Sequence, residues 1–234
     1  EWVSALKHLV NDFSGTAMAI YVLVHGATAG GWIWQSIPAR LRAAGHDAFT
    51  LTLTGLGERR HLFSPDITME THILDVLNVL FFEDLHQVIL VGHSYGGAVI
   101  TGVAEKAAER LSHLVYLDAF VPQDGEAVRD LYDPPVVHTL TEHYLNGGKS
   151  LPVNGAEASD PRFTEHPLKT FFQPFHLKNE EYLTIDPLMN SSVSPTGAPA
   201  DMSRKIPCWL LKKPSRWARP GSKSTFFLLK TNWW

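Results

Sequence analysis

The stretch from Val88 to Ala98 constrains the fold more than any other part of this 234-residue chain. It reads Val-Ile-Leu-Val-Gly-His-Ser-Tyr-Gly-Gly-Ala: an apolar run, a serine between glycines, and small residues that open a helical stretch. Gly92, Ser94 and Gly96 match the G-x-S-x-G nucleophile elbow, a sharp turn from strand to helix. The apical serine of such a turn is strained, and glycines on either side let strand and helix approach closely. The pattern predicts that Ser94 is held at an exposed apex.

A glycine-rich turn with an incidental serine would match the same five letters. The apolar run before the turn and the small residues after it favour the elbow. In an elbow, the N–H of Tyr95 lies at the helix N-terminus, where the helix dipole and unbonded amides stabilise a developing oxyanion. Tyr95 is therefore a candidate oxyanion donor.

A second apolar run, 19–24, ends in His25-Gly26-Ala27, and more small residues follow. A plain strand-to-helix turn would have this composition too. In elbow proteins, however, the second oxyanion donor comes from a loop after an early strand. Ala27 is the candidate for that donor, and His25 is expected to hold the loop in place.

Strands and helices are expected to alternate along the first half of the chain. The expected strands are 19–24, 48–53, 88–92 and 114–117, and the expected helices are 32–44, 68–82 and 99–110. This order predicts an α/β fold with a mostly parallel sheet and helices on both faces. Ligands of such sheets bind beyond the carboxyl ends of the strands. Ala27, Ser94 and Asp118 all follow such ends, so one cleft is expected to hold them.

The pattern breaks between residues 123 and 204, where prolines and scattered aromatic residues are frequent. A structureless loop of this length is rare in a compact domain, so the segment is interpreted as a helical cap over the cleft. Short helices are expected near 126–133, 162–173 and 178–185. Four cap aromatics either line an apolar pocket or pack the cap, and packing is the default: Phe171, Phe172, Phe175 and Tyr182.

Three segments complete the predicted organisation. Residues 1–17 are expected to be an extension or leader, with Met18 as the natural start. Residues 18–122 and 205–234 form the predicted core, with a last apolar strand at 206–211, and 123–204 form the cap. From residue 204 onward the chain has eight Lys or Arg and no Asp or Glu. This C-terminal part is atypical, and a truncated or frame-shifted terminus is the hypothesis that accounts for it.

Composition narrows the function classes. A net charge of −4 argues against a nucleic-acid partner. The lone Cys208 excludes an internal disulfide framework and a multi-cysteine metal site, and no metal is expected. The glycines of 54–61 are too few for a dinucleotide fingerprint, and no apolar run has the length of a membrane span. A cytoplasmic location is expected, without a membrane partner.

Four segments, taken together and in order, resemble α/β-hydrolases, most closely the small esterases related to plant methylesterases, salicylate-binding esterases and hydroxynitrile lyases. They are Tyr21-Val-Leu-Val-His-Gly-Ala with Gly30-Gly-Trp-Ile-Trp, Leu53-Thr-Gly-Leu-Gly-Glu-Arg, the elbow, and Leu114-Val-Tyr-Leu-Asp-Ala-Phe-Val-Pro. The resemblance is dense over 18–125. It implies an eight-stranded, mostly parallel sheet, a helical cap, small ester substrates and no cofactor.

Carried over by position, the resemblance makes Ser94 the nucleophile and Ala27 and Tyr95 the oxyanion donors. The lyase branch has a threonine at the position of Gly26 and a lysine after its catalytic histidine. Neither feature is present here, which favours an esterase over a lyase.

The C-terminal part departs from the family. The family places its acid after the strand that matches 206–211, and its histidine later, in a Gly-His segment. Here Lys212-Lys213-Pro214-Ser215 stands in the first place, and no histidine follows His176. Asp118 is the candidate acid, although a loop or capping carboxylate is an equally good reading of that residue.

A general base is harder to find, because a serine needs a histidine or equivalent to take its proton. His93 is expected to pack beneath the elbow. The base would then have to be a cap histidine whose side chain contacts Ser94. The candidates there are His138, His143, His166 and His176.

The predicted function is hydrolysis of small carboxylic esters through an acyl-enzyme, impaired if no base is recruited. The alternatives are a hydrolase-fold protein that binds ligand without turnover and, less favoured, a hydroxynitrile lyase. A terminus that left a sheet edge exposed would promote pairing, so a homodimer is among the expectations.

Overall fold

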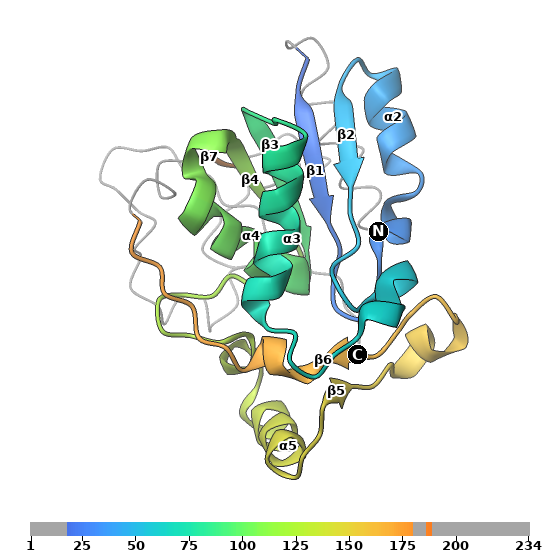
Figure 1. The fold of residues 1–234 in the computed structure, drawn as a ribbon, viewed down its shortest axis with the longest axis vertical. Helices are drawn as coiled ribbons and strands as arrows, with labels where there is room; N and C mark the ends of the chain where they lie inside the picture. The colour runs from blue at the N-terminus through green and yellow to red at the C-terminus, as the bar shows by residue number, and fades with distance from the viewer. Residues whose placement is uncertain (1–17, 180–185, 189–234) are drawn as a thin grey trace, which may run out of the picture.

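The computed structural model describes residues 18–179 and 186–188, and its centre is a parallel sheet. In the described part the sheet has five strands in the order β2-β1-β3-β4-β7, with parallel pairing throughout (Figure 1). The strands are β1 (Ile20–Val24), β2 (Asp47–Thr50), β3 (Val88–His93), β4 (Leu111–Leu117) and β7 (Asp186–Leu188). The predicted parallel sheet is confirmed, and five of the eight strands implied by the resemblance lie in this part.

Helices cover both faces of the sheet, as predicted. On one face, α3 (Met69–Phe82) and α4 (Tyr95–Ala107) pack in a large apolar cluster with the even-numbered residues of β1 and β3. On the other, α2 (Ile37–Ala43) and a 3-10 turn at Gly31–Trp34 pack against the odd-numbered residues of the same strands. This alternation follows from the two-residue period of a strand. Both faces of the central strands are therefore buried.

The helix and strand boundaries differ from the prediction in several places. The helix expected over 32–44 is divided into the 3-10 turn and α2, which has a proline in its first turn. The strand expected over 48–53 ends at Thr50, and the one expected over 114–117 starts earlier, at Leu111. α3 begins where predicted, with Thr68 as its N-cap, and the Thr71 hydroxyl accepts a hydrogen bond from the Thr68 N–H at 3.2 Å.

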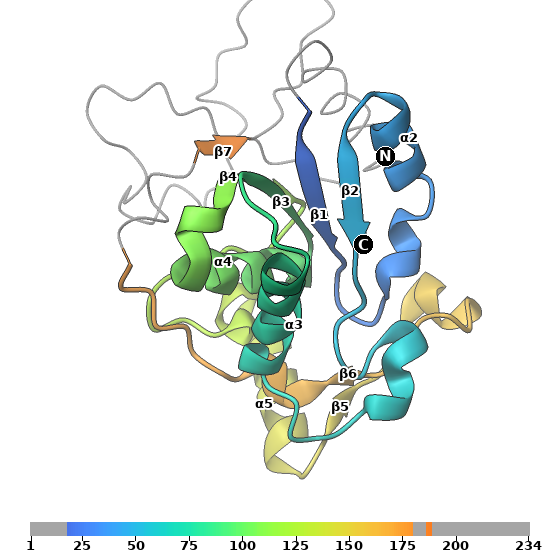
Figure 2. The same cartoon turned by 45° about the horizontal axis from the view of Figure 1, so that its top comes forward.

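The cap lies beyond the end of the sheet toward which β1 and β2 point (Figures 1 and 2). It contains α5 (Pro134–Leu145) and the antiparallel pair β5 (Ser150–Leu151) and β6 (His166–Pro167). It also contains 3-10 turns at Val128–Leu131, Gly155–Ser159 and Leu168–Phe171.

The predicted cap helices are largely wrong. The helix expected near 126–133 is only the 3-10 turn Val128–Leu131. The helix expected over 162–173 is replaced by β6 and the 3-10 turn Leu168–Phe171. The one longer helix of the described cap, α5, was not predicted. The helix expected near 178–185 falls mostly outside the described residues.

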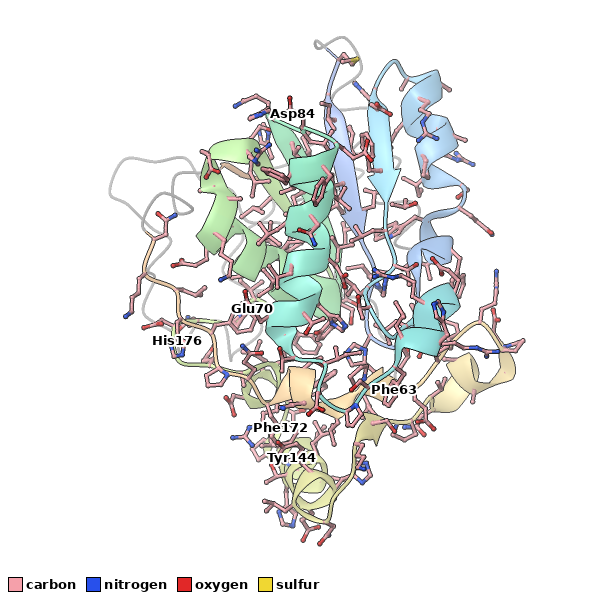
Figure 3. All side chains as sticks on the ribbon, in the orientation of Figure 1. Phe63, Glu70, Asp84, Tyr144, Phe172 and His176 are labelled. Atoms are coloured by element: carbon pink, nitrogen blue, oxygen red, sulfur yellow. The ribbon has the colours of Figure 1, made fainter. Side chains whose placement is uncertain are left out.

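Aromatic side chains of the cap pack, which was the default expectation. Phe171 and Phe175 are buried and belong to the same apolar cluster as α3 and α4. Phe172 stacks on Tyr144 of α5, with ring centroids 4.2 Å apart, and the two side chains lie together at the cap in Figure 3. Arg129 covers the Phe172 ring at 4.6 Å. Tyr182 lies outside the described residues.

The last part of the described chain returns to the sheet. β7 lies inside the 123–204 stretch assigned to the cap and pairs with β4, so this piece of that stretch is part of the sheet. Segments 1–17 and 189–234, which include the expected strand at 206–211, lie outside the described residues. None of the helices described at 18–179 is long and apolar enough to cross a membrane.

Candidate active site

The elbow forms as predicted, with Ser94 between the end of β3 and the start of α4. Ser94 has φ 51° and ψ −120°, a conformation that L-residues rarely adopt. A Cβ on Gly92 would lie 2.6 Å from the Gly96 carbonyl oxygen, and a Cβ on Gly96 would lie 2.7 Å from the carbonyl oxygens of Val24 and His25. Both positions therefore require glycine, because strand and helix backbones meet there.

Backbone hydrogen bonds hold the elbow against the neighbouring strand. The Ser94 N–H donates to the Leu117 carbonyl oxygen at 3.1 Å. The Ser94 carbonyl oxygen accepts from the N–H groups of Gly97, at 3.0 Å, and Phe120, at 3.1 Å. These bonds offset strain of the kind found at functional sites, which costs about 1–3 kcal/mol. The serine is only partly buried.

The loop after β1 lies directly beside the serine, as predicted. A Cβ on Gly26 would lie 3.1 Å from Ser94 Cβ. The next residue, Ala27, is partly buried, and its N–H makes no hydrogen bond to any of the described residues. The N–H of Tyr95 is one of the first amides of α4, which have no acceptor within their own helix. The two predicted donors thus flank the serine on adjacent segments.

His25 holds this loop, which confirms its expected structural role. Its Nε2 accepts a hydrogen bond from the Leu53 N–H at 3.0 Å. That nitrogen is therefore unprotonated, and Nδ1 carries the proton and donates to the Gly26 carbonyl oxygen at 2.7 Å. Burial lowers the pKa of His25 to about 4. The neutral His25 ring therefore stabilises the loop through hydrogen bonds at both of its nitrogens.

His93 ends β3 and Asp118 follows the end of β4, at the same end of the sheet. Asp118 follows β4 with φ 45°. His93 is the last residue of β3, and its ring meets Trp34 edge-on, with centroids 6.3 Å apart. Burial lowers the pKa of His93, and the Asp118 carboxylate opposes that shift. The expected packing of His93 under the elbow is confirmed, and the acid role of Asp118 stays a prediction.

A buried polar cluster around Tyr95 was not foreseen. The Tyr95 hydroxyl lies 2.8 Å from His72 Nδ1, and His72 Nε2 donates to the Thr54 carbonyl oxygen at 2.9 Å. Both side chains are fully buried, and burial lowers the pKa of His72 to about 4. The helical spacing indicates that His72 is buried, because position 72 lies on the same face of α3 as the buried residues Met69, Ile73 and Val76.

Only one of the four cap histidines approaches this region. His166 is fully buried, and its ring lies 4.5 Å from the Tyr95 ring, centroid to centroid. Its Nδ1 accepts from the Thr28 N–H at 3.3 Å, and its Nε2 lies 2.9 Å from Thr170 Oγ1. Both nitrogens are engaged, so His166 is not poised to accept a proton from the serine.

The other three cap histidines are exposed. His138 pairs with Glu142 on α5, and His143 Nε2 lies 3.0 Å from the Ser150 carbonyl oxygen. His176 is exposed near the end of the cap. The ring nitrogens of His25, His72 and His166 all bond to groups other than Ser94 Oγ. Within residues 18–179 and 186–188 there is no group of three or more side chains able to hold a metal ion.

The loop after β2 is fixed by a carboxylate of α3. Asp75 accepts from the Thr54 N–H at 2.6 Å, from the Thr54 hydroxyl at 2.7 Å and from Arg59 Nη1 at 3.1 Å. Arg59 Nη1 also donates to the Thr52 carbonyl oxygen at 2.7 Å. The Arg59 side chain is thus hydrogen-bonded within the protein, to Asp75 and to the Thr52 carbonyl oxygen.

The chain is similar to known esterases over parts of their length. It is 49% identical over 130 residues to a carbendazim hydrolyzing esterase from Nocardioides sp. (strain SG-4G), covering 56% of this chain and 54% of that protein. It is 30% identical over 162 residues to salicylic acid-binding protein 2 of Nicotiana tabacum, covering 66% of this chain and 62% of the relative. The chain spans about half the length of these curated relatives.

The fold is similar to those of solved hydrolase and methylesterase structures. An extracellular alpha/beta-hydrolase from a Paenibacillus species superimposes with a TM-score of 0.63 at 26% identity, over 72% of this chain and 75% of that one. The methylesterase MES16 from Arabidopsis superimposes with a TM-score of 0.54 at 26% identity, over 73% and 76%. The model of the alpha/beta hydrolase family matches residues 21–228. This chain, with its parallel sheet and serine elbow, belongs to the alpha/beta hydrolase family.

Proposed function

We propose that this protein is a serine esterase that hydrolyses small carboxylic esters through an acyl-enzyme. The observation that carries the proposal is the strained apex of Ser94 beside the Gly26-Ala27 loop. Ser94 Oγ attacks the ester carbonyl carbon, and the alcohol leaves. The amides of Ala27 and Tyr95 stabilise the tetrahedral oxyanion in each half-reaction. Water then attacks the acyl-serine and releases the carboxylic acid.

The curated relatives support this reaction class, since the matched proteins are named as esterases and methylesterases. The relative from Nocardioides is named for hydrolysis of carbendazim. Carbendazim therefore belongs among the first compounds to test, beside simple p-nitrophenyl esters. No metal or organic cofactor enters the proposed steps.

The proposed hydrolysis is impaired if no base is recruited to Ser94, because His25, His72 and His166 direct their ring nitrogens to other groups. Without a base the serine keeps its proton and attacks the ester slowly. Asp118 is retained as the candidate acid. It acts only if a base lies between it and the serine.

The test is the initial rate of p-nitrophenyl acetate and carbendazim hydrolysis by the whole chain and by two variants. Ser94→Ala removes the nucleophile and is expected to reduce the enzymatic rate to background. Ser112→Ala, which removes a hydroxyl of β4 bonded to the Gln87 carbonyl oxygen, is the matched control and retains the rate. Equal rates in wild type and Ser94→Ala would refute the proposed mechanism.

The second candidate is a hydrolase-fold protein that binds a small molecule without turnover. It is favoured because His25, His72 and His166 bond to groups other than Ser94. Under this alternative an ester binds, its binding is insensitive to Ser94→Ala, and no alcohol is released. A lyase is disfavoured, because Gly26 stands where the lyase branch has a threonine. Cyanide release from mandelonitrile would revive it.

A further inference from the structure

Thr28 follows the candidate donor Ala27 and bonds to the cap through all of its polar groups. Its N–H donates to His166 Nδ1 at 3.3 Å, and its carbonyl oxygen accepts from the Thr164 N–H at 2.8 Å. Its hydroxyl lies 2.8 Å from Glu157 Oε2 and 2.6 Å from the Ala27 carbonyl oxygen. The residue is 5% exposed. Thr28 is therefore hydrogen-bonded to three cap residues, each more than a hundred positions away in the sequence.

The backbone conformation of Thr28 requires stabilising contacts of this kind. Its φ is 61°, in the left-handed region that a β-branched residue strongly disfavours. A conformation of this kind persists only where surrounding contacts determine it. The hydrogen bonds from the cap provide those contacts. Without them the loop would relax, and the adjacent Ala27 amide would change direction.

His166 also contacts the other candidate donor. Its ring meets the Tyr95 ring edge-on, at 4.5 Å between centroids and an interplanar angle of 73°. The hydrogen bond from Thr28 leaves the His166 proton on Nε2, which donates to Thr170 Oγ1 at 2.9 Å. Thr170 in turn donates to the Pro167 carbonyl oxygen at 2.8 Å. The directions of these bonds are consistent only with a neutral His166.

We propose that Thr28 and His166 are positioning residues that couple the cap to the oxyanion hole. The cap fixes Thr28, Thr28 fixes the Ala27 amide, and His166 packs on the residue that carries the second amide. Cap placement then sets the alignment of both donors. The catalytic meaning of this coupling rests on the proposed esterase activity, but the mechanical coupling does not.

Three variants test the coupling. His166→Leu removes the acceptor of the Thr28 N–H, and His166→Asn returns an acceptor near the place of Nδ1. Glu157→Ala removes an exposed carboxylate that the Thr28 hydroxyl contacts, and it leaves the buried cluster intact. The matched control is His138→Leu, because this cap histidine has a side chain 72% exposed and lies on α5.

For p-nitrophenyl acetate, His166→Leu is expected to lower kcat about 10- to 100-fold while KM stays within about twofold, since a misaligned donor mainly weakens the transition state. Glu157→Ala lowers kcat by a smaller factor, and His166→Asn recovers part of the loss. His138→Leu matches the wild type. A rise in KM with unchanged kcat in both His166→Leu and Glu157→Ala would mean that the cap only shapes the substrate pocket, and would overturn the proposal.

Amide hydrogen exchange of residues 26–30 keeps the test independent of turnover. Loss of one hydrogen bond is expected to speed exchange of the Thr28 amide about fivefold in His166→Leu. If the wild type hydrolyses no ester, the esterase proposal fails, and exchange alone decides the coupling. Unchanged exchange would refute it. If His166→Leu does not fold, Glu157→Ala decides, with faster exchange supporting the coupling and unchanged exchange refuting it.

Discussion

Acid should unfold this protein through its buried neutral histidines. Burial lowers the pKa of His25 to about 4, against about 6.5 in an unfolded chain. Below pH 6.5 the unfolded state therefore binds a proton at this site that the folded state does not. Stability is fully present above the unfolded pKa and is lost as the pH falls toward the folded pKa. His25 alone then costs about 2 kcal/mol of unfolding free energy between about pH 7 and pH 5.

Two further histidines act in the same direction. Burial lowers the pKa of His72 to about 4, and it lowers the pKa of His166 well below its usual value. Protonation would also remove the acceptors used by the Tyr95 hydroxyl and by the Thr28 N–H. The loss for the whole protein over this interval is therefore expected to exceed the contribution of His25.

The assay is urea denaturation at several pH values between about 7 and 5, where the unfolding free energy reports proton uptake directly. His25→Gln keeps an acceptor near Nε2 for the Leu53 N–H and removes one titrating group, so it should give a shallower pH dependence. His138→Gln, at an exposed position, is the control and should keep the wild-type slope. An unfolding free energy that does not change between about pH 7 and 5 would refute this reasoning.

Four further predictions concern stability and rate. Gly92→Ala places a Cβ 2.6 Å from the Gly96 carbonyl oxygen, so it should abolish ester hydrolysis and lower the unfolding free energy by about 1–3 kcal/mol in urea titrations. Asp75→Ala leaves the partly buried amide and hydroxyl of Thr54 without their acceptor and should lower the unfolding free energy by about 1–3 kcal/mol. Asp84→Asn, at a side chain that is 86% exposed and a φ of 49° that asparagine tolerates, should change the unfolding free energy by less than about 0.5 kcal/mol. Without a histidine base, the rate of p-nitrophenyl acetate hydrolysis should rise continuously with pH, and a plateau above a pKa near 7 would show that a base is recruited.

The elbow and its neighbouring loop could be predicted because their constraints are local. Gly92 and Gly96 are required by backbone contacts across a single turn, and the residue types alone record that requirement. The parallel sheet could also be predicted from the sequence, since strands buried on both faces appear as continuous apolar runs. Ala27 and Ser94 follow the carboxyl ends of parallel strands, which predicts that they share one cleft, and the structure brings their segments together.

The cap was harder, because its order comes from contacts distant in sequence. α5 buries only Leu140 among its twelve residues, so its apolar periodicity is weak, although Asp133 and the two prolines that follow mark a helix start. The bond between Thr28 and His166 joins positions 138 apart. No local pattern announces such a contact, and the sequence alone could only name His166 as one of four cap histidines.

The measurement that tests the central proposal most directly is the mass of the protein during turnover. The wild type is mixed with excess p-nitrophenyl acetate, quenched in acid within seconds and digested, and the peptide that contains Ser94 is analysed. The proposed mechanism predicts one acetyl group on Ser94, which is absent from Ser94→Ala and present in Ser112→Ala. Nitrophenol release with no acyl group on Ser94, or with the group on another residue, would contradict the account.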